Sequence, residues 1–435
     1  MDLNSDIRAA ESNPQQLEQL YREARRTGKA ESFKAAIESV YETASDNLLF
    51  AAWYYRLAEE VKAAGRTINW AAAIPISIMT GLIFWALSDF ENALIIGELP
   101  QLVLWWSPVA SLGGLAFMVI TAKKGYGIAA ALGLGLLATA GYVLLLLPAF
   151  RNGWASDQYL LIALIHLPLL CWVALGIAAL GINASLENRF ALLIKSIEVG
   201  IVGGLYLGAG LVLGGITIGM FAALGIQLPD ILLRLITAGG GGLLPVLAGA
   251  TIYAPTVEPA EQDFEHGLSK LIATILRLLL PLTLIVLAAY VLVIPFNFMA
   301  PFESRDVLIV YNLMLFGIIG LLIGATPLKA GELSPAVQRY LRLGILIVAI
   351  LAALISLYAL AAVAFRTFQG NLTPNRLTVI GWNSINIGIL LALIITQIGK
   401  GEAGWIDRIQ EVFSRATNAY IAWGIFLVVG LPIIF

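Results

Sequence analysis

Long apolar stretches alternate with short polar segments along the chain from residue 69 onward. Crossing about 30 Å of hydrocarbon takes about 20 helical residues, because each residue advances an α-helix by about 1.5 Å. The pattern therefore predicts eleven membrane-spanning helices. They cover residues 69–88, 103–121, 126–149, 158–182, 199–224, 235–255, 274–295, 307–328, 342–365, 377–397 and 418–435.

The first 68 residues follow a different pattern, with apolar side chains at helical spacing among polar ones. Asn13-Pro14 is typical of a helix start and Gly28 of a helix end, and two further apolar faces follow. This pattern predicts three amphipathic helices. The expected fold class is an all-α, polytopic helical membrane protein, with a small cytoplasmic helical region, 1–68, ahead of a transmembrane bundle, 69–435.

The first two of these helices and their glycine turn are loosely similar to a tetratricopeptide unit, a repeat that cannot bury its apolar face alone. That face must pack on the third helix, the membrane surface, the transmembrane bundle or a protein. The region is expected to be either a cytoplasmic cap on the bundle or a docking module in which residues 1–64 bind a cytoplasmic protein. Trp53, Tyr54 and Tyr55 suit the aromatic belt of a membrane interface.

Lysine and arginine sort to one side of the predicted spans. Of the 26 in the chain, nine lie in residues 1–68, twelve near the loops of the same side and five in the opposite loops, namely Arg151, Arg234, Arg305, Arg366 and Arg376. Because cytoplasmic loops carry an excess of these residues, we expect a cytoplasmic N-terminus and an outside C-terminus. No signal-peptide core precedes the first span, and the expected location is the bacterial inner (cytoplasmic) membrane.

The composition agrees with a chain surrounded by lipid. Hydrophobic residues make up 59% of it and charged residues 12%, against about a quarter charged in soluble domains. The net charge of −2 gives no reason to expect nucleic acid as a partner. The lipid bilayer is the partner that the sequence predicts, and association with further copies of the chain stays open.

Two predicted spans are rich in glycine. The fifth has glycines at several four-residue spacings, which is typical either of a tightly packed central helix or of a helix that lines a narrow pathway. The sixth opens with Gly239, Gly240, Gly241 and Gly242 and continues to Pro245. Because glycine and proline both disfavour regular helix, we expect either a broken segment that exposes backbone groups to a substrate, or a kink.

Two ionisable residues fall at or inside predicted spans. Glu198 precedes the glycine-rich fifth span, and we expect residues 184–198 to form an interfacial lead-in with an exposed Glu198–Lys195 pair. Glu198 is then either a structural partner of Lys195 or a coupling or gating carboxylate. His166 lies two residues before Pro168 in the fourth span, where a neutral imidazole is expected to satisfy a backbone carbonyl.

The tenth span carries a polar cluster of Trp382, Asn383, Ser384 and Asn386. Asn383 and Asn386 are three residues apart and share a helix face. Amides in hydrocarbon need partners, so this face is expected to point inward. The two asparagines either join neighbouring helices by hydrogen bonds or line a solvated cavity.

The chain has no motif of a known enzyme in the sequence context that the motif requires. Gly133-x-Gly135-x-x-Ala138 has the spacing of a dinucleotide fingerprint but lies inside a predicted membrane helix, and no Walker A, H-E-x-x-H or G-x-S-x-G motif is present. Cys171 is the single cysteine, and the acidic stretch around His266 lacks metal-ligand spacing. We therefore expect no enzymatic activity, no catalytic residue, no metal and no cofactor.

Two segments resemble a bacterial membrane family. They are S-L-E-N-R-F at 185–190 with the glycine-rich span after it, and N-L-T-P-N-R-L-T-V-I-G-W-N-S-I-N at 371–386. Both are similar to the multi-spanning group catalogued as domain of unknown function 4153, in which an L-T-P-x-R element likewise opens a late membrane helix. The resemblance covers about residues 70–435 and implies a polytopic bacterial membrane protein, with no catalytic residues to transfer.

The same element is interpretable on its own. Thr373-Pro374 is typical of a helix start, with a cap and a proline in the first turn. Arg376 then lies one turn from the outer interface. It either anchors the helix among lipid headgroups or faces an extracellular vestibule together with Arg366.

Two functions from different classes remain. The first is a transporter or channel for a small solute or lipid, in which the fifth, sixth and tenth spans converge on one hydrated cavity. The second is a non-catalytic sensor or assembly factor whose N-terminal helices bind a cytoplasmic partner. The number of spans favours the first, because eleven exceed what an anchor needs.

Overall fold

The computed structural model describes residues 3–26, 30–64, 68–89, 94–95, 99–146, 153–181, 183–303, 305–329, 331, 333–398 and 403–435. The chain divides into two compact units, Met1–Thr67 and Ile68–Phe435. We refer to them as the N-terminal unit and the membrane unit. The predicted helix end at Gly28 lies outside the described residues.

In its described residues the N-terminal unit has four helices, one more than predicted: α1 (Leu3–Ala9), α2 (Pro14–Arg26), α3 (Ala30–Thr43) and α4 (Leu48–Ala64). The Asn13 side chain accepts a hydrogen bond from the Gln16 amide at 3.2 Å, as a helix cap does. Apolar faces of all four helices enclose one core. The unit therefore buries its own apolar surface.

Trp53 belongs to this core and not to a membrane interface as predicted. Its side chain is 5% exposed and packs edge-on against Tyr21 and Phe33, with ring centroids 5.2 and 5.8 Å away. The Arg56 guanidinium covers the indole at 4.4 Å. Of the three residues of the predicted aromatic belt, only Tyr55 is largely exposed. The burial of Trp53 therefore removes the main support for placing α4 at the membrane interface.

The membrane unit is helical and contains eleven helices long and apolar enough to cross a bilayer within the described residues. They are formed by α5 (Trp70–Leu87), α6 (Leu102–Ala122), α7 (Tyr126–Leu146), α8 (Gly153–Leu180), α9 (Leu186–Ala223), α10 (Asp230–Arg234) with η2 (Leu235–Gly239) and α11 (Gly240–Ile252), α12 (Gly267–Val293) with η4 (Ile294–Asn297), α14 (Arg305–Ala325), α15 (Pro335–Gln369), α16 (Pro374–Gln397), and α17 (Trp405–Ile425) with η6 (Phe426–Gly430) and α18 (Leu431–Ile434). The predicted fold class and span count are confirmed.

The remaining elements are short. A two-residue strand, β1 (Leu94–Ile95), pairs antiparallel with β2 (Leu99–Pro100) between α5 and α6. A single helical turn, η3 (Pro259–Glu261), lies in the loop before α12, and α13 (Ala300–Glu303) precedes α14.

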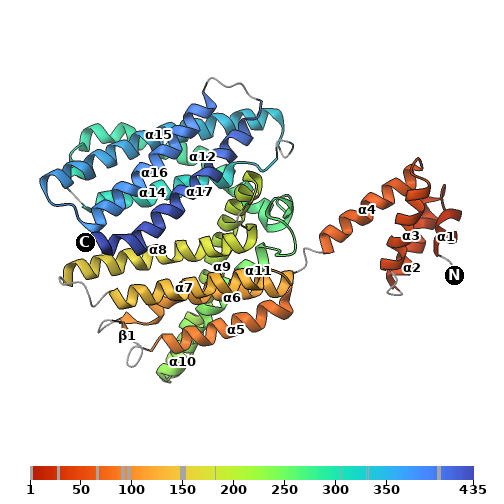
Figure 1. The fold of residues 1–435 in the computed structure, drawn as a ribbon, viewed down its shortest axis with the longest axis horizontal. Helices are drawn as coiled ribbons and strands as arrows, with labels where there is room; N and C mark the ends of the chain where they lie inside the picture. Colours follow the sequence, from red (N-terminus) through yellow and green to blue (C-terminus); the bar gives the residue numbers. More distant parts are fainter. Residues whose placement is uncertain are drawn as a thin grey trace. The chain divides into compact units, whose positions relative to one another are not determined.

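The spanning helices form two groups with α9 between them (Figure 1). The first group contains α5, α6, α7, α8 and α11, and the second contains α12, α14, α15, α16 and α17. The α9 helix contacts α11 of one group and α17 of the other. Contacts of α8 with α16 and α17 also join the groups, so their boundary runs through the middle of the unit.

The α9 helix differs from both predictions made for it. It runs unbroken for 38 residues, about 57 Å at the α-helical rise, without a separate lead-in before residue 199. Its glycine-rich half lies on the surface, and a Cβ atom added at Gly204, Gly208 or Gly215 would meet nothing within 4 Å. This half is neither a packed central helix nor the lining of an internal pathway.

The glycine run of the sixth span starts at the last residue of a π-helical turn, η2, and its other three glycines begin α11 without a break. The predicted break is therefore a local widening of one helix. Gly239 and Gly242 allow α11 to approach α5, because a Cβ on Gly242 would lie 2.7 Å from Cγ of Phe84 and 2.8 Å from Cα of Gly81. Gly240 and Gly241 have no such neighbour.

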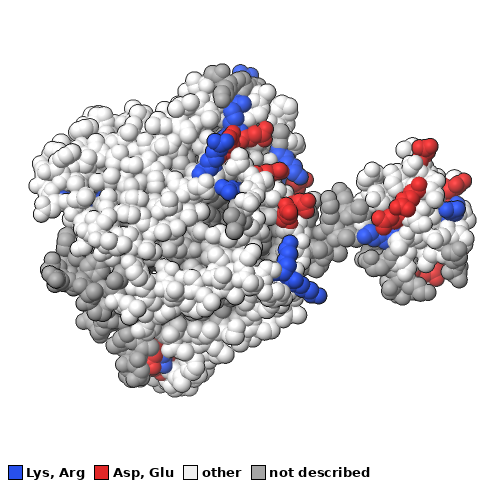
Figure 2. Space-filling view, in the orientation of Figure 1, with Lys and Arg blue, Asp and Glu red and all other residues white. Residues whose placement is uncertain are grey.

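Charged residues gather along one edge of the membrane unit, which we call the charge-rich face (Figure 2). It is formed by the ends of α6, α8, α11, α14 and α16 and by the helix starts that follow them. Arginines there donate to the last carbonyls of neighbouring helices: Arg277 to Ala325 at 3.2 Å and Arg342 to Gln397 at 2.8 Å. Such capping pairs a cation with the negative helix end.

Candidate functional site

The polar cluster of the tenth span lies on α16. The helix begins as expected, with the Thr373 hydroxyl accepting from the Arg376 amide at 3.2 Å and Pro374 in the first turn. Asn383 and Asn386 are each 1% exposed, so the amide face points into the protein. Ser384 points away and is exposed, and its hydroxyl donates to the Ile380 carbonyl of its own helix.

His166 of α8 joins this face across the boundary between the helix groups. Its Nε2 accepts from Nε1 of Trp382 at 2.8 Å, and its Nδ1 lies 2.7 Å from the Ile162 carbonyl. Because indole N–H only donates and a carbonyl only accepts, the imidazole is neutral with its proton on Nδ1. His166 therefore contacts a backbone carbonyl of its own helix, although not the Leu164 carbonyl that Pro168 leaves without an amide partner.

The two asparagines are only partly satisfied. The Tyr420 hydroxyl of α17 donates to Oδ1 of Asn386. The Nδ2 atoms of Asn383 and Asn386 are fully enclosed and have no hydrogen-bond partner. An enclosed donor without an acceptor costs about 1–3 kcal/mol, so each of these groups calls for a ligand or water acceptor.

A third enclosed donor lies nearby. Nε1 of Trp423 in α17 also lacks a partner. The indole fills the space beside Gly381, where an added Cβ would lie 1.9 Å from Cζ2 of Trp423. We call the side chains of His166, Trp382, Asn383, Asn386 and Tyr420 the amide centre. Asn386 lies about 18 Å along α16, which is half its length.

Glu198 forms a second polar centre with Lys195 of α9 and Ser269 of α12. Oε2 of Glu198 accepts from Lys195 Nζ at 2.9 Å and from the Ser269 hydroxyl at 2.6 Å. Both charged side chains are 2% exposed, so the pair is buried and not exposed as predicted. Lys195 also donates to the Asp263 carbonyl at 2.6 Å and lies 4.1 Å from the Phe264 ring centroid. We call this set the ionic centre.

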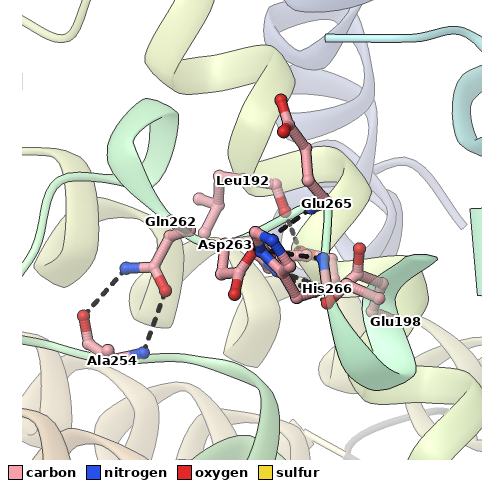
Figure 3. Close-up of polar contacts among 10 residues, drawn as sticks. Leu192, Glu198, Ala254, Gln262, Asp263, Glu265 and His266 are labelled. Carbon is pink, nitrogen blue, oxygen red and sulfur yellow. Dashed lines mark hydrogen bonds and ion pairs between the residues drawn. The ribbon is translucent and has the colours of Figure 1, made fainter. Parts of the chain in front are cut away.

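The loop between α11 and α12 closes over the ionic centre (Figure 3). The Gln262 side chain accepts from the Ala254 amide at 3.1 Å and donates to the Ala254 carbonyl at 2.8 Å. Asp263 accepts from the backbone amide and the ring Nδ1 of His266. Asn188 of α9 donates to Glu258 at 2.9 Å. The ionic centre therefore joins α9, this loop and α12.

Cavities open on both faces of the membrane unit. One of about 310 Å³ lies on the charge-rich face, between α6, α8 and the loop after α11, and is lined by Lys124, Asn188 and Tyr253 among others. Burial, with Glu258 nearby, raises the pKa of Tyr253 to about 12. The other, of about 580 Å³, lies on the opposite face and is lined by Arg366 and Arg376.

The structure separates the residues that the sequence grouped as one pathway. Asn383, Asn386 and His166 come together, whereas Gly239 and Gly242 pack on α5 and Glu198 lies in the ionic centre. Because α11 packs on α5, α6 and α9 and α16 packs mainly on α15 and α17, the fifth, sixth and tenth spans do not share a centre. Tyr420 and Ser269 were missed, since no local pattern marks a residue whose partner lies on another helix.

No group of three metal-binding side chains is found among the described residues. No family model, curated protein or solved structure matches the chain. Its class follows from the fold itself: it is a multi-pass, predominantly helical integral membrane protein.

Proposed function

We propose that the membrane unit carries a small solute or lipid across the bilayer and that the cargo binds at the amide centre. The observation that carries this proposal is the pair of enclosed Nδ2 donors on Asn383 and Asn386 without partners. A protein that only needed to join α16 to α17 would gain nothing from leaving both donors unmatched. The cargo would supply acceptor oxygens.

The position of the amide centre supports this proposal. It lies between α8 of the first helix group and α16 and α17 of the second, about halfway along each spanning segment. Transporters bind substrate near the bilayer midplane, where two helix groups can rock against each other. The π-helical turn η6 adds polar backbone at this boundary, with the Val428 and Val429 carbonyls accepting from the Tyr159 and Tyr142 hydroxyls.

The test is to identify what the amide centre retains. The full chain is extracted into native-lipid nanodiscs, and its bound small molecules and lipids are recorded by native mass spectrometry. Asn383→Leu and Asn386→Leu are expected to lose a species that the wild type and Ser384→Ala keep, because Ser384 lies on the same helix but faces away. Flux of that species into proteoliposomes then tests transport.

Two results would contradict the proposal. If the wild type and both leucine variants retain the same species, the amide centre binds no cargo. If the leucine variants are more stable than the wild type and the wild type carries nothing, the asparagines act only between helices. The resemblance to domain of unknown function 4153 supports a bacterial inner membrane as the location and adds no activity.

A second function, a sensor or assembly factor, is favoured by one feature of the N-terminal unit. Its core is closed, yet Tyr41, Tyr54 and Tyr55 form a partly exposed aromatic patch, with Tyr41 and Tyr54 stacked at 4.7 Å. Deleting residues 1–64 should leave the membrane unit folded and remove a stoichiometric cytoplasmic protein from the native mass spectrum. If the deletion instead unfolds the membrane unit, the N-terminal unit is a structural cap.

A further inference from the structure

The 580 Å³ cavity lies opposite the charge-rich face, where α15 ends and α16 begins. Glu303, Phe302, Phe365, Arg366, Gly370 and Arg376 line it, and we call it the arginine vestibule. Its volume is typical of a ligand site. Two arginines face one carboxylate, so the lining carries an excess of positive charge.

Neither arginine is neutralised. In the described residues no ion pair joins Arg366 or Arg376 to Glu303 or to another carboxylate, and Nη1 of Arg366 is enclosed without any hydrogen-bond partner. Arg234, on the same face, is instead paired with Asp89 and Asp230 at 3.7 and 2.7 Å. Guanidinium groups left with free donors suit the planar, multidentate oxygens of an anion.

The turn between the two helices orients Arg376. Its Nη1 donates to the Asn371 carbonyl at 2.7 Å and its backbone amide to the Thr373 hydroxyl at 3.2 Å. Gly370 leaves room for the guanidinium, because a Cβ there would lie 2.8 Å from Arg376 Nη1. The Gly370 amide in turn donates to the Arg366 carbonyl at 3.2 Å. The glycine beside the Arg376 guanidinium is therefore held to the backbone of Arg366.

The other half of the lining is apolar. Phe302 lies between Phe298 and Phe365, with ring centroids 5.6 and 5.5 Å away, and Met299 and Phe365 remain 49% and 40% exposed. Cationic donors beside an open aromatic surface at a membrane boundary match a group that is anionic at one end and apolar at the other.

We propose that the arginine vestibule binds the phosphate group of an amphiphilic molecule through Arg366 and Arg376, with Phe302 and Phe365 contacting its apolar part. The site stands apart from the amide centre and does not depend on transport. The same chemistry is offered by a phospholipid headgroup and by a free phosphate, and the test separates these sources.

The test is calorimetric titration of the full chain in neutral detergent with dihexanoyl phosphatidylglycerol or with inorganic phosphate. The wild type is expected to bind the lipid saturably. Arg366→Gln and Arg376→Gln should each weaken binding by about tenfold or more, because each removes charge-assisted hydrogen bonds. Arg234→Gln, which removes a paired arginine from the same face, should bind like the wild type.

Gly370→Ala is the variant that keeps both charges. It should weaken binding by displacing the Arg376 guanidinium, and Arg366→Lys should weaken it less than Arg366→Gln, which guards against a misfolded glutamine variant. Lipid binding that is weakened in Phe365→Ala would assign the site to a headgroup, whether or not inorganic phosphate competes. Binding of inorganic phosphate, with a lipid affinity unchanged in Phe365→Ala, would assign it to free phosphate and contradict the aromatic contact. The proposal would be overturned if the wild type bound neither probe saturably, or if both glutamine variants bound the lipid as tightly as the wild type.

Discussion

At the scale of single residues, the ionic centre presents the sharpest energetic problem, since two charges are held away from water. Lys195 and Glu198 each hydrogen-bond to Ser269, so the desolvation of both charges is offset by a closed network. Removing one partner leaves the other charge buried and unpaired. That situation differs from the exposed pair expected from the sequence.

We predict that Glu198→Gln and Lys195→Met each destabilise the membrane unit by about 3–5 kcal/mol, and that the double variant Lys195→Met/Glu198→Leu recovers much of the loss. Thermal unfolding in nanodiscs measures this. Thr274→Ala is the control on the same helix as Ser269, because Thr274 is exposed and its hydroxyl donates to the Lys270 carbonyl of its own helix. Single variants as stable as the wild type but defective in flux would identify Glu198 as a coupling carboxylate.

A pH effect is expected in the N-terminal unit. Hydrogen bonds from Arg22 and Arg56 lower the pKa of Glu18 below its ordinary value of 4.5. The folded unit therefore favours the ionised carboxylate, a contribution present above pH 4.5 and lost as the pH falls through the lower folded-state pKa. The hydrogen-exchange protection factors of residues 3–64 in the full chain should fall with acid less steeply in Glu18→Gln. Equal pH profiles would show that the two arginines contribute nothing.

At the scale of helices, identical residues have opposite roles. Gly242 touches α5, whereas Gly208 of α9 has open space around it. We predict that Gly242→Ala destabilises the membrane unit by about 1–3 kcal/mol through overpacking against Phe84, and that Gly208→Ala is neutral or stabilising by up to about 1 kcal/mol. Unfolding temperatures in nanodiscs compare the two variants.

The α9 variant also tests self-association. A loss of stability in Gly208→Ala, or a change in oligomeric mass, would contradict a lipid-facing surface and show that another copy of the chain packs there. Small residues on an exposed membrane helix favour such packing, but they do not require it.

These glycines show where prediction from sequence ends. Span number and fold class follow from hydropathy alone, because the bilayer imposes helical length on every segment. Hydropathy does not show whether a glycine stripe faces another helix or lipid, since both environments are apolar. The π-helical turns and the unbroken 38-residue α9 likewise depend on packing against other helices.

The amide centre was predictable only on its own helix. An asparagine side chain that faced hydrocarbon would have no hydrogen-bond partner. The inward direction of Asn383 and Asn386 could therefore be inferred from their spacing. Their surroundings could not, because His166 and Trp382 are 216 residues apart in the chain. The joining of the fourth, tenth and eleventh spans is a property of the tertiary fold.

At the scale of the whole molecule, the orientation in the bilayer remains a prediction from charge. The chain enters α5 on the charge-rich face, where the Asn69 side chain donates to Thr121 at the end of α6 at 3.3 Å. If that face is cytoplasmic, residues 1–67 are cytoplasmic too, and the arginine vestibule opens to the outside.

Single cysteines placed on each face decide this orientation. In a Cys171→Ala background, we expect a membrane-impermeant maleimide to label Asn371→Cys in intact spheroplasts and to label Glu187→Cys only after permeabilisation, since both native residues are exposed on opposite faces. The physical reason is that cytoplasmic retention of lysine and arginine near the span ends fixes the direction of insertion. The reverse labelling pattern would place the N-terminal unit outside, and any partner it binds would then have to be sought there.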